Sequence, residues 1–534
     1  MRHAQGLAVA LVGAWAATAS AGTHVVTFGG GPPSHNQISL ERNVEYFRRV
    51  LDGVGLGAAR HDVYFGDAGA RNSVQYRLPE SDDQRLARAL GMILMNNSEA
   101  DVRYEKVGLP GLAGPSSVAN VEAWFEVVGR SLPPGDRLVF YFTGHGGPDA
   151  ANREAPRNTT LIMPGHPGAL TVQQFAAQLD KLSPGVDATL VMVQCYSGGF
   201  ANVIYNEGDP AKGFAPHPRA GFFSTVASRT AAGCTPDVSE EDYHEFSTSF
   251  FEAILGATRT GRPVARPDHD GDGRTSFDEA FAHVLLTSDT IDIPTTTSDR
   301  LLRDKSRFAR DDADGARGLL PQDAPWSTVL DAASPSQRAA LEGLSQALGL
   351  DGEDRLATAR ARAAEIDPGR NRGRGRGPGQ RRGNQDQGPT AQAPPPGGRG
   401  PGQGFNVGRL RAALADRWPE LTVPFHPDAP RIIAEERDEI RRVLEAQPDF
   451  AALSRRVARH APDPEALART PERRWVKHRR LLERADSVIL GANLPRLDDP
   501  EALGVYRRLL ELEHRVLAPD APAPVAEGRP AGGS

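Results

Sequence analysis

Two short apolar runs, 138–142 and 190–193, have the length and composition of strands that are buried on both faces. His145 closely follows the first run and Cys195 the second, and glycines lie near both residues. In a parallel sheet the carboxyl ends of the strands meet at one edge, where reacting groups converge. We therefore expect these two side chains to lie close together at the edge of a parallel sheet.

A cysteine and a histidine placed in this way predict nucleophilic catalysis. The attacking species is a thiolate, and an imidazole can take its proton and later give that proton to a leaving amine. The backbone N–H groups of Gly146 and Cys195 would donate to the negative oxygen that develops on the attacked carbonyl. The alternative is that Cys195 is a core residue, as is common for a single cysteine after an apolar strand. His145 and its glycines favour a cysteine peptidase.

Further apolar runs at 25–28, 62–65 and 222–227 alternate with helical stretches and predict an α/β domain. Its sheet should be mainly parallel and flanked by helices. Thr171 and Gln174 have the spacing of a capping box, which predicts a helix between the two catalytic strands. A helical region should follow this domain toward the C-terminus.

The strand–His–Gly element followed by a strand–Cys element resembles the legumain and caspase group of cysteine peptidases. In caspases the histidine also precedes the cysteine, by about 50 residues. The resemblance covers roughly residues 24–300 and is stronger to the legumains. Residues 160–164 and 170–175 resemble the hairpin and helix between the catalytic strands, and 221–228 resembles the next strand. The resemblance implies a caspase-like fold, a catalytic Cys–His dyad, and protein or peptide substrates.

The sequence departs from the family pattern just before the nucleophile, where Val193 replaces the Glu or Gln of the specificity pocket. A preference for asparagine or aspartate is therefore not implied. An acidic run after the next strand could form a pocket for a basic side chain, or it could be an ordinary solvated face. Its members are Asp237, Glu240, Glu241, Asp242 and Glu245.

The segment 268–279 fits the twelve-position calcium loop of EF-hands, with a glycine at the sharp turn. Pro263 and Pro267 exclude a regular helix before the loop. We therefore expect one structural Ca²⁺ site with an exit helix over 277–286, and not a paired switching domain; the alternative is an acidic turn. The predicted ligands are Asp268, Asp270, Asp272, Arg274 through its carbonyl, Ser276 and Glu279.

The first 21 residues have the pattern of a secretory signal peptide. Arg2 and His3 precede an apolar segment at 7–17, and small residues at 19–21 match a cleavage site. We therefore expect an exported protein, periplasmic or extracellular. No later run reaches the ~20 apolar residues of a membrane span. A net charge of −6 argues against a general nucleic-acid binder.

The chain has two cysteines. A disulfide between Cys195 and Cys234 would be compatible with export, but it would remove the proposed nucleophile. We expect Cys234 to be a free or buried thiol, with a regulatory disulfide as the alternative.

A chain of 534 residues is too long for one hydrophobic core. After the signal peptide we expect a peptidase domain at 22–300, a helical extension at 301–366 and a helical domain at 409–517. The segment 367–408 is rich in Arg, Gly and Pro and cannot bury a core. It should be a disordered linker, and 518–534 a disordered tail. By resemblance to legumains, the C-terminal helical region would inhibit the peptidase or recruit substrate, and cleavage of the linker would change activity.

Three function classes follow from these residues. The first is an exported cysteine endopeptidase with a structural calcium site. The second is a non-catalytic calcium-binding interaction protein with the same fold. The third is an α/β-hydrolase esterase, in which His145 and its glycines would form an oxyanion loop. That class needs a glycine in place of Val193 and a histidine late in the chain, so the order of His145 and Cys195 favours the first class.

Overall fold

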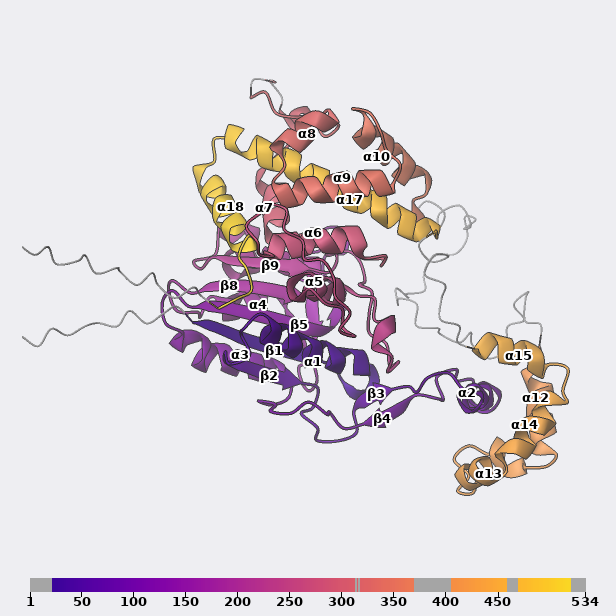
Figure 1. Cartoon of the computed structure of the whole chain (residues 1–534). Helices are drawn as coiled ribbons and strands as arrows, with labels where there is room; N and C mark the ends of the chain where they lie inside the picture. The colour runs from indigo at the N-terminus through magenta and orange to yellow at the C-terminus, as the bar shows by residue number, and fades with distance from the viewer. Residues whose placement is uncertain (1–21, 313–314, 316, 369–404, 459–468, 520–534) are drawn as a thin grey trace, which may run out of the picture.

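The computed structural model describes residues 22–312, 315, 317–368, 405–458 and 469–519 (Figure 1). The predicted signal peptide lies outside these residues, as do most of the predicted linker and tail. None of the helices in the described part is both long enough and apolar enough to cross a bilayer.

The centre of the molecule is an eight-stranded mixed sheet in which five consecutive strands are parallel, as the apolar runs predict. The hairpin of β6 (Thr160–Ile162) and β7 (Ala169–Thr171) extends the end of β5. A separate ribbon pairs β3 (Val74–Tyr76) with β4 (Arg103–Glu105). The order of the main strands is β10 (Thr295–Thr296, antiparallel), β9 (Arg219–Phe223), β8 (Asp187–Met192), β5 (Arg137–Gly147), β1 (Thr23–Gly30) and β2 (His61–Phe65).

Helices cover both faces of the sheet, so the central strands are buried on both sides. In β5, Val139 and Tyr141 belong to the core on one face, and Phe140 and Phe142 belong to the core on the other. This alternation is the two-residue period of a strand. One core is closed by α1 (Ile38–Gly53), α5 (Phe246–Leu255) and α6 (Phe277–Thr287), and the other by α3 (Val118–Val127) and α4 (Val172–Leu179).

Two capping boxes set the start of helices that matter for the site. In α4 the backbone N–H of Gln174 donates to Thr171 Oγ1 over 3.2 Å, and Gln174 Oε1 accepts from the Thr171 N–H over 2.9 Å. Ser276 and Glu279 form the same arrangement at α6. The helices predicted between β5 and β8 and at the end of the 268–279 loop are therefore both confirmed.

Helices from two distant parts of the chain, 297–365 and 471–513, form a layer over one face of the sheet (Figure 1). Apolar residues of α17, among them Leu481, Ala485 and Ile489, share one core with Phe222 of the sheet and Phe281 of α6. The helices are α7 (Thr297–Lys305), α8 (Trp326–Ala332), α9 (Pro335–Ala347), α10 (Arg355–Glu365), α17 (Pro471–Asn493) and α18 (Pro500–Glu513).

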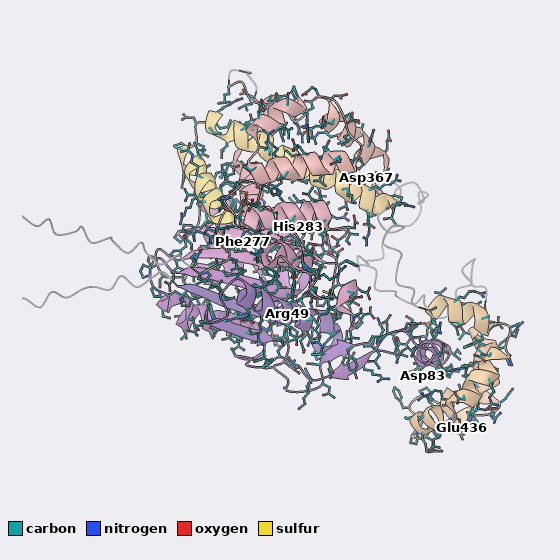
Figure 2. The ribbon with its side chains drawn as sticks, in the orientation of Figure 1. Arg49, Asp83, Phe277, His283, Asp367 and Glu436 are labelled. Carbon is teal, nitrogen blue, oxygen red and sulfur yellow. The ribbon has the colours of Figure 1, made fainter. Side chains whose placement is uncertain are left out.

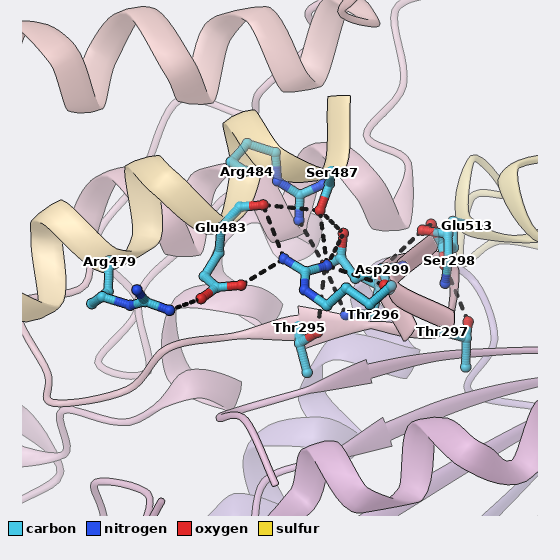
Figure 3. Close-up of polar contacts among 11 residues, drawn as sticks. Thr295, Thr296, Thr297, Ser298, Asp299, Arg479, Glu483, Arg484, Ser487 and Glu513 are labelled. Carbon is cyan, nitrogen blue, oxygen red and sulfur yellow. Dashed lines mark hydrogen bonds and ion pairs between the residues drawn. The ribbon is translucent and has the colours of Figure 1, made fainter. Parts of the chain in front are cut away.

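Buried polar contacts join α7 to α17 and α18 (Figure 3). Asp299 on α7 accepts from Arg484 over 3.2 Å and from Ser487 over 2.5 Å, both on α17. Glu513, at the end of α18, accepts hydrogen bonds from Ser298, and burial raises the pKa of its carboxyl to about 7. Because these groups are buried, the C-terminal helices belong to the same folded unit as the sheet.

The segment 409–517, which was predicted to be one helical domain, packs against two separate parts of the protein. The part up to residue 457 packs on α2 (Asp82–Met95), away from the sheet, as the positions of Asp83 and Glu436 in Figure 2 show. The remainder, α17 and α18, joins the main core. The helices packed with α2 are α12 (Val407–Ala415), α13 (Ala429–Glu435), α14 (Arg437–Glu445) and α15 (Phe450–Val457).

Arg480 tests whether α17 is part of the main core. This residue is 1% exposed, and its guanidinium donates to the backbone carbonyls of Ser288, Thr290 and Asp292. Arg480→Leu leaves these carbonyls without their donors, so we expect the free energy of unfolding to fall by about 3 kcal/mol. Urea denaturation of the full-length protein measures this change.

The adjacent variant Arg479→Leu is the matched control. Arg479 forms an ion pair with Glu483 at the surface, so its loss should change the free energy of unfolding by less than about 1 kcal/mol. Equal effects in the two variants would contradict the integration of α17 into the core.

Candidate active site

The register of the central strands brings His145 and Cys195 to one level of the sheet edge. β5 and β8 pair in parallel, with Phe142 opposite Met192. Each of the two titratable residues lies three positions beyond its member of this pair. Both side chains are half-buried, so they are enclosed by protein but still reach solvent. The structure thus places the two sequence-predicted residues at neighbouring strand ends.

Gly146 packs tightly against the other strand end. A Cβ atom on this residue would lie 2.0 Å from the carbonyl oxygen of Cys195 and 2.7 Å from Cγ of Gln194. Every side chain larger than hydrogen would therefore push the strand ends apart. The backbone of Gly146 therefore lies directly against the backbone of Cys195.

A sharp turn presents the thiol. Tyr196, directly after Cys195, has a φ of 60° and a ψ of 19°, which is left-handed backbone that few non-glycine residues adopt. Its N–H donates to the Arg229 carbonyl over 2.8 Å, and the N–H of Gly198 donates to the Thr225 carbonyl over 2.8 Å. The turn is therefore fixed to the segment that follows β9.

The thiol of Cys195 is neutral at ordinary pH. Burial raises its pKa above the usual value, and the charge of Asp292 adds to this rise. A backbone N–H partly offsets it, because Ala231 donates to Sγ over 3.3 Å. The resting thiol is therefore a weak nucleophile until a base takes its proton.

The imidazole of His145 is also neutral. Burial lowers its pKa to about 4, and the neighbouring His35, whose ring centre is 5.6 Å away, lowers it further through its charge. Nε2 lies 2.9 Å from Oε1 of Gln37. Because that oxygen can only accept, Nε2 carries the proton, and Nδ1 keeps the lone pair that a base needs.

The two side chains, both in the described part of the chain, do not hydrogen-bond to each other; each is held by another partner. No sequence motif points to these partners, which are Gln37 for the imidazole and Ala231 for the thiol. They are single residues in irregular segments, and no spacing rule marks them. The arrangement can nevertheless perform base-assisted thiol attack, since a neutral imidazole and a neutral thiol stand at one sheet edge.

The segment over the thiol is anchored by α17. The Ala232 N–H donates to Oδ1 of Asp292 over 2.7 Å, and Arg480 on α17 donates to the backbone carbonyl of the same aspartate over 2.8 Å. Arg229 lies 3.2 Å from Glu472 and 5.0 Å from the ring centre of Trp475, both on α17. The C-terminal helix thereby fixes the chain that touches the candidate nucleophile.

The second cysteine is not disulfide-bonded to the first. Burial raises the pKa of Cys234 well above the usual value, and the charge of a Cys195 thiolate would raise it further. Cys234 is therefore a protonated free thiol near the site, in agreement with the sequence prediction.

Three members of the predicted acidic run lie against arginines. Asp237 is 3.0 Å from Arg77, and Glu240 is 3.1 Å from Arg49. The buried Glu245 is 3.7 Å from a third guanidinium. Their charges are already neutralised, which weakens the case for an acidic pocket for basic side chains.

Three of the predicted calcium ligands come together. Oxygens of Asp268, Asp270 and Glu279 lie within 4.8 Å of one another, whereas Asp272 is outside this group and accepts from the Arg274 N–H over 2.7 Å. Ser276 lies beside Glu279, with 2.8 Å between the hydroxyl and Oε2. Several hard oxygens in one loop fit a divalent cation such as Ca²⁺. The residues present therefore fit a metal site, although the donor set does not identify the metal.

No protein-family model matches this chain, and no curated protein matches it. Among solved structures, protein GSU0716 from Geobacter sulfurreducens is similar over 52% of this chain and 92% of its own length. The sequence identity is 12% and the TM-score is 0.29, so the match carries no argument about family or function. The resemblance to legumains and caspases remains a prediction from the sequence.

Calcium should stabilise the folded protein. A ligand at 100 times its Kd adds ~2.7 kcal/mol to the free energy of unfolding, so excess Ca²⁺ should raise the melting temperature of the full-length protein relative to a chelator. Asp270→Ala removes one ligand and should abolish this shift. Asp242→Ala, at an exposed acidic residue outside the loop, is the control and should retain it. A shift that persists in Asp270→Ala would place the calcium elsewhere.

Proposed function

We propose that this protein is an exported cysteine endopeptidase in which Cys195 is the nucleophile and His145 the acid and base. The observation that carries the proposal is the contact of the two strand ends, where Gly146 lies directly against the backbone of Cys195. This contact brings a thiol, an imidazole and backbone donors to one sheet edge. Its substrates would be proteins or peptides, and export follows from the predicted signal peptide.

The reaction would begin with proton transfer from the Cys195 thiol to Nδ1 of His145, while Sγ bonds to the scissile carbonyl carbon. The carbonyl oxygen takes the negative charge and accepts from the N–H groups of Gly146 and Cys195. The imidazolium then protonates the leaving nitrogen as the C–N bond breaks, which leaves a thioester on Cys195. His145 next takes a proton from water, whose oxygen attacks the thioester and releases the acid and the free thiol.

Gln37 would support both halves of this cycle. Its Oε1 accepts from Nε2, so it holds the ring with Nδ1 available for the thiol proton. Substrate must also take the place beside Sγ where the Ala231 N–H now lies. The neutral resting pair fits an enzyme whose proton transfer occurs only with substrate in place.

The calcium loop would have a structural role. In its last positions, the N–H of Phe277 donates to the Arg515 carbonyl over 2.9 Å, and Ser276 pairs with Val516. The loop therefore joins the start of α6 to the end of the C-terminal helical layer. A bound Ca²⁺ would neutralise the loop carboxylates and so stabilise this junction.

The alternative is a non-catalytic calcium-binding interaction protein with the same fold. The observation in its favour is that Cys195 and His145 each hydrogen-bond to a different partner. In that case the strand-end residues would have a structural role only, and neither would be needed for any hydrolysis.

Peptide cleavage tests the proposal. The full-length protein without its signal peptide is incubated with a proteome-derived peptide library, and the new termini are identified by mass spectrometry. Cys195→Ala should abolish cleavage, because it removes the only group that forms the thioester. His145→Ala should lower kcat by about 100-fold or more, because it removes the acid and base.

Cys234→Ala is the matched control, since it removes the neighbouring thiol but not the proposed nucleophile. It should cleave the same peptides at a similar rate. Cleavage that survives Cys195→Ala would contradict the assignment, and an absence of cleavage by the native protein, with calcium present, would favour the interaction protein.

A further inference from the structure

A cavity of about 310 Å³ opens beside the turn that carries Cys195. Four parts of the chain line it: the loop after β5, the 3-10 helix after the nucleophile, the segment after β9, and the region of β10 and α7. The polar lining residues are Glu154, Arg157, Asn202, Ser228, Thr295 and Arg300.

The cavity lies within reach of a substrate bound at the nucleophile. Gly198, which lines it, is three residues after Cys195. Since consecutive Cα atoms are 3.8 Å apart, the two Cα atoms are separated by at most ~11 Å. An extended peptide advances about 3.3 Å per residue. A side chain two or three residues from the scissile bond can therefore enter the cavity.

Two arginines give the cavity its positive charge. Arg300 is held in place, since its Nε donates to Oδ1 of Asn202 over 2.7 Å and its guanidinium lies 3.4 Å from Asp304. The guanidinium of Arg157 has no hydrogen-bond or ion-pair partner among the described residues. Only its backbone is fixed, because its carbonyl accepts from Nδ2 of Asn202 over 3.2 Å. One cation is thus available to a ligand.

The loop that carries Arg157 is organised around a buried carboxylate. Asp149, 5% exposed, accepts hydrogen bonds of 3.0 to 3.1 Å from the backbone N–H groups of Ala151, Asn152, Arg157 and Asn158. Burial alone would raise the pKa of Asp149, but these four donors together hold it below the usual value. The backbone of the loop at Arg157 is therefore held in one conformation by these hydrogen bonds.

Negative charge at the cavity is limited. Glu154 lines it and is exposed, and Asp304 faces Arg300. Ser228, which lines the cavity, has a hydroxyl that can donate, whereas the Thr295 hydroxyl donates to Oδ2 of Asp299 over 3.4 Å. A carboxylate in the cavity could accept from Arg157 and from Ser228, and guanidinium–carboxylate pairs are among the stronger polar contacts.

We propose that this cavity is a substrate subsite for an acidic side chain, aspartate or glutamate, two or three residues from the scissile bond. The inference rests on the proposed peptidase function. It names the substrate class as peptides with a carboxylate at that distance from the cleaved bond. Arg157 is the main specificity-determining residue, and Arg300 forms the positively charged wall behind it.

Cleavage-site profiling tests the subsite. With the peptide library and the full-length enzyme, we expect Asp and Glu to be enriched at one position two or three residues from the cut. For a substrate pair that differs only in Glu or Gln at that position, the native enzyme should prefer Glu by about 10-fold, as for a charged hydrogen bond. Arg157→Gln should remove this preference, so that the Glu and Gln peptides are cleaved at similar rates. Arg153→Gln, on the same loop but outside the cavity lining, should keep it.

A separate binding measurement distinguishes this inference from the peptidase proposal. Fluorescein-labelled octapeptides of Gly, Ala and Ser, with one Glu, Gln or Lys, are titrated into Cys195→Ala and followed by anisotropy. Tighter binding of the Glu peptide, lost in Cys195→Ala with Arg157→Gln, supports the subsite even if the native protein cleaves nothing. Three results would overturn the subsite: cleavage without enrichment of Asp or Glu, a preference for Lys that depends on Glu154, or peptide binding that Arg157→Gln does not change. The first of these results would leave the peptidase assignment intact.

Discussion

The parallel pairing of β5 with β8 is the constraint on which the candidate site depends. It sets His145 and Cys195 at one level, and Gly146 allows their backbones to touch. A shift of one residue in this register would move each side chain to the other face of the sheet. Because the strands are buried on both faces by apolar residues, such a shift would also expose core side chains. The core therefore maintains the geometry of the site.

The C-terminal helices complete this core and also reach the site. α17 fills the layer above the sheet and, through Arg480 and the contacts of Arg229, fixes the segment that touches the Cys195 thiol. A helix that both closes the core and anchors the site cannot be removed without loss of structure. The resemblance to legumains predicts a C-terminal helical region that can be separated from the peptidase domain. Only the helices that pack on α2, which lie away from the sheet, fit this prediction (Figure 1).

The strands, the capping boxes and the two strand-end residues could be predicted because they follow from local rules of burial and hydrogen bonding. The partners of His145 and Cys195 could not be predicted, because Gln37 and Ala231 reach them through irregular segments whose path no periodicity encodes. The division of 409–517 was also missed, because an amphipathic stripe shows that a helix packs but not on which surface. The packing of α12 on α2 joins residues that are more than 300 positions apart.

Covalent capture with a substrate-like inhibitor tests the central claim, that Cys195 attacks a bound carbonyl with the help of His145. A peptidyl acyloxymethyl ketone places a ketone at the scissile position, and attack by sulfur displaces the carboxylate. Peptide mass spectrometry then locates the adduct. We expect an adduct on Cys195 that forms at an unchanged rate in Cys234→Ala and much more slowly in His145→Ala. An adduct on Cys234 alone, or labelling of Cys195 at the same rate without His145, would contradict it.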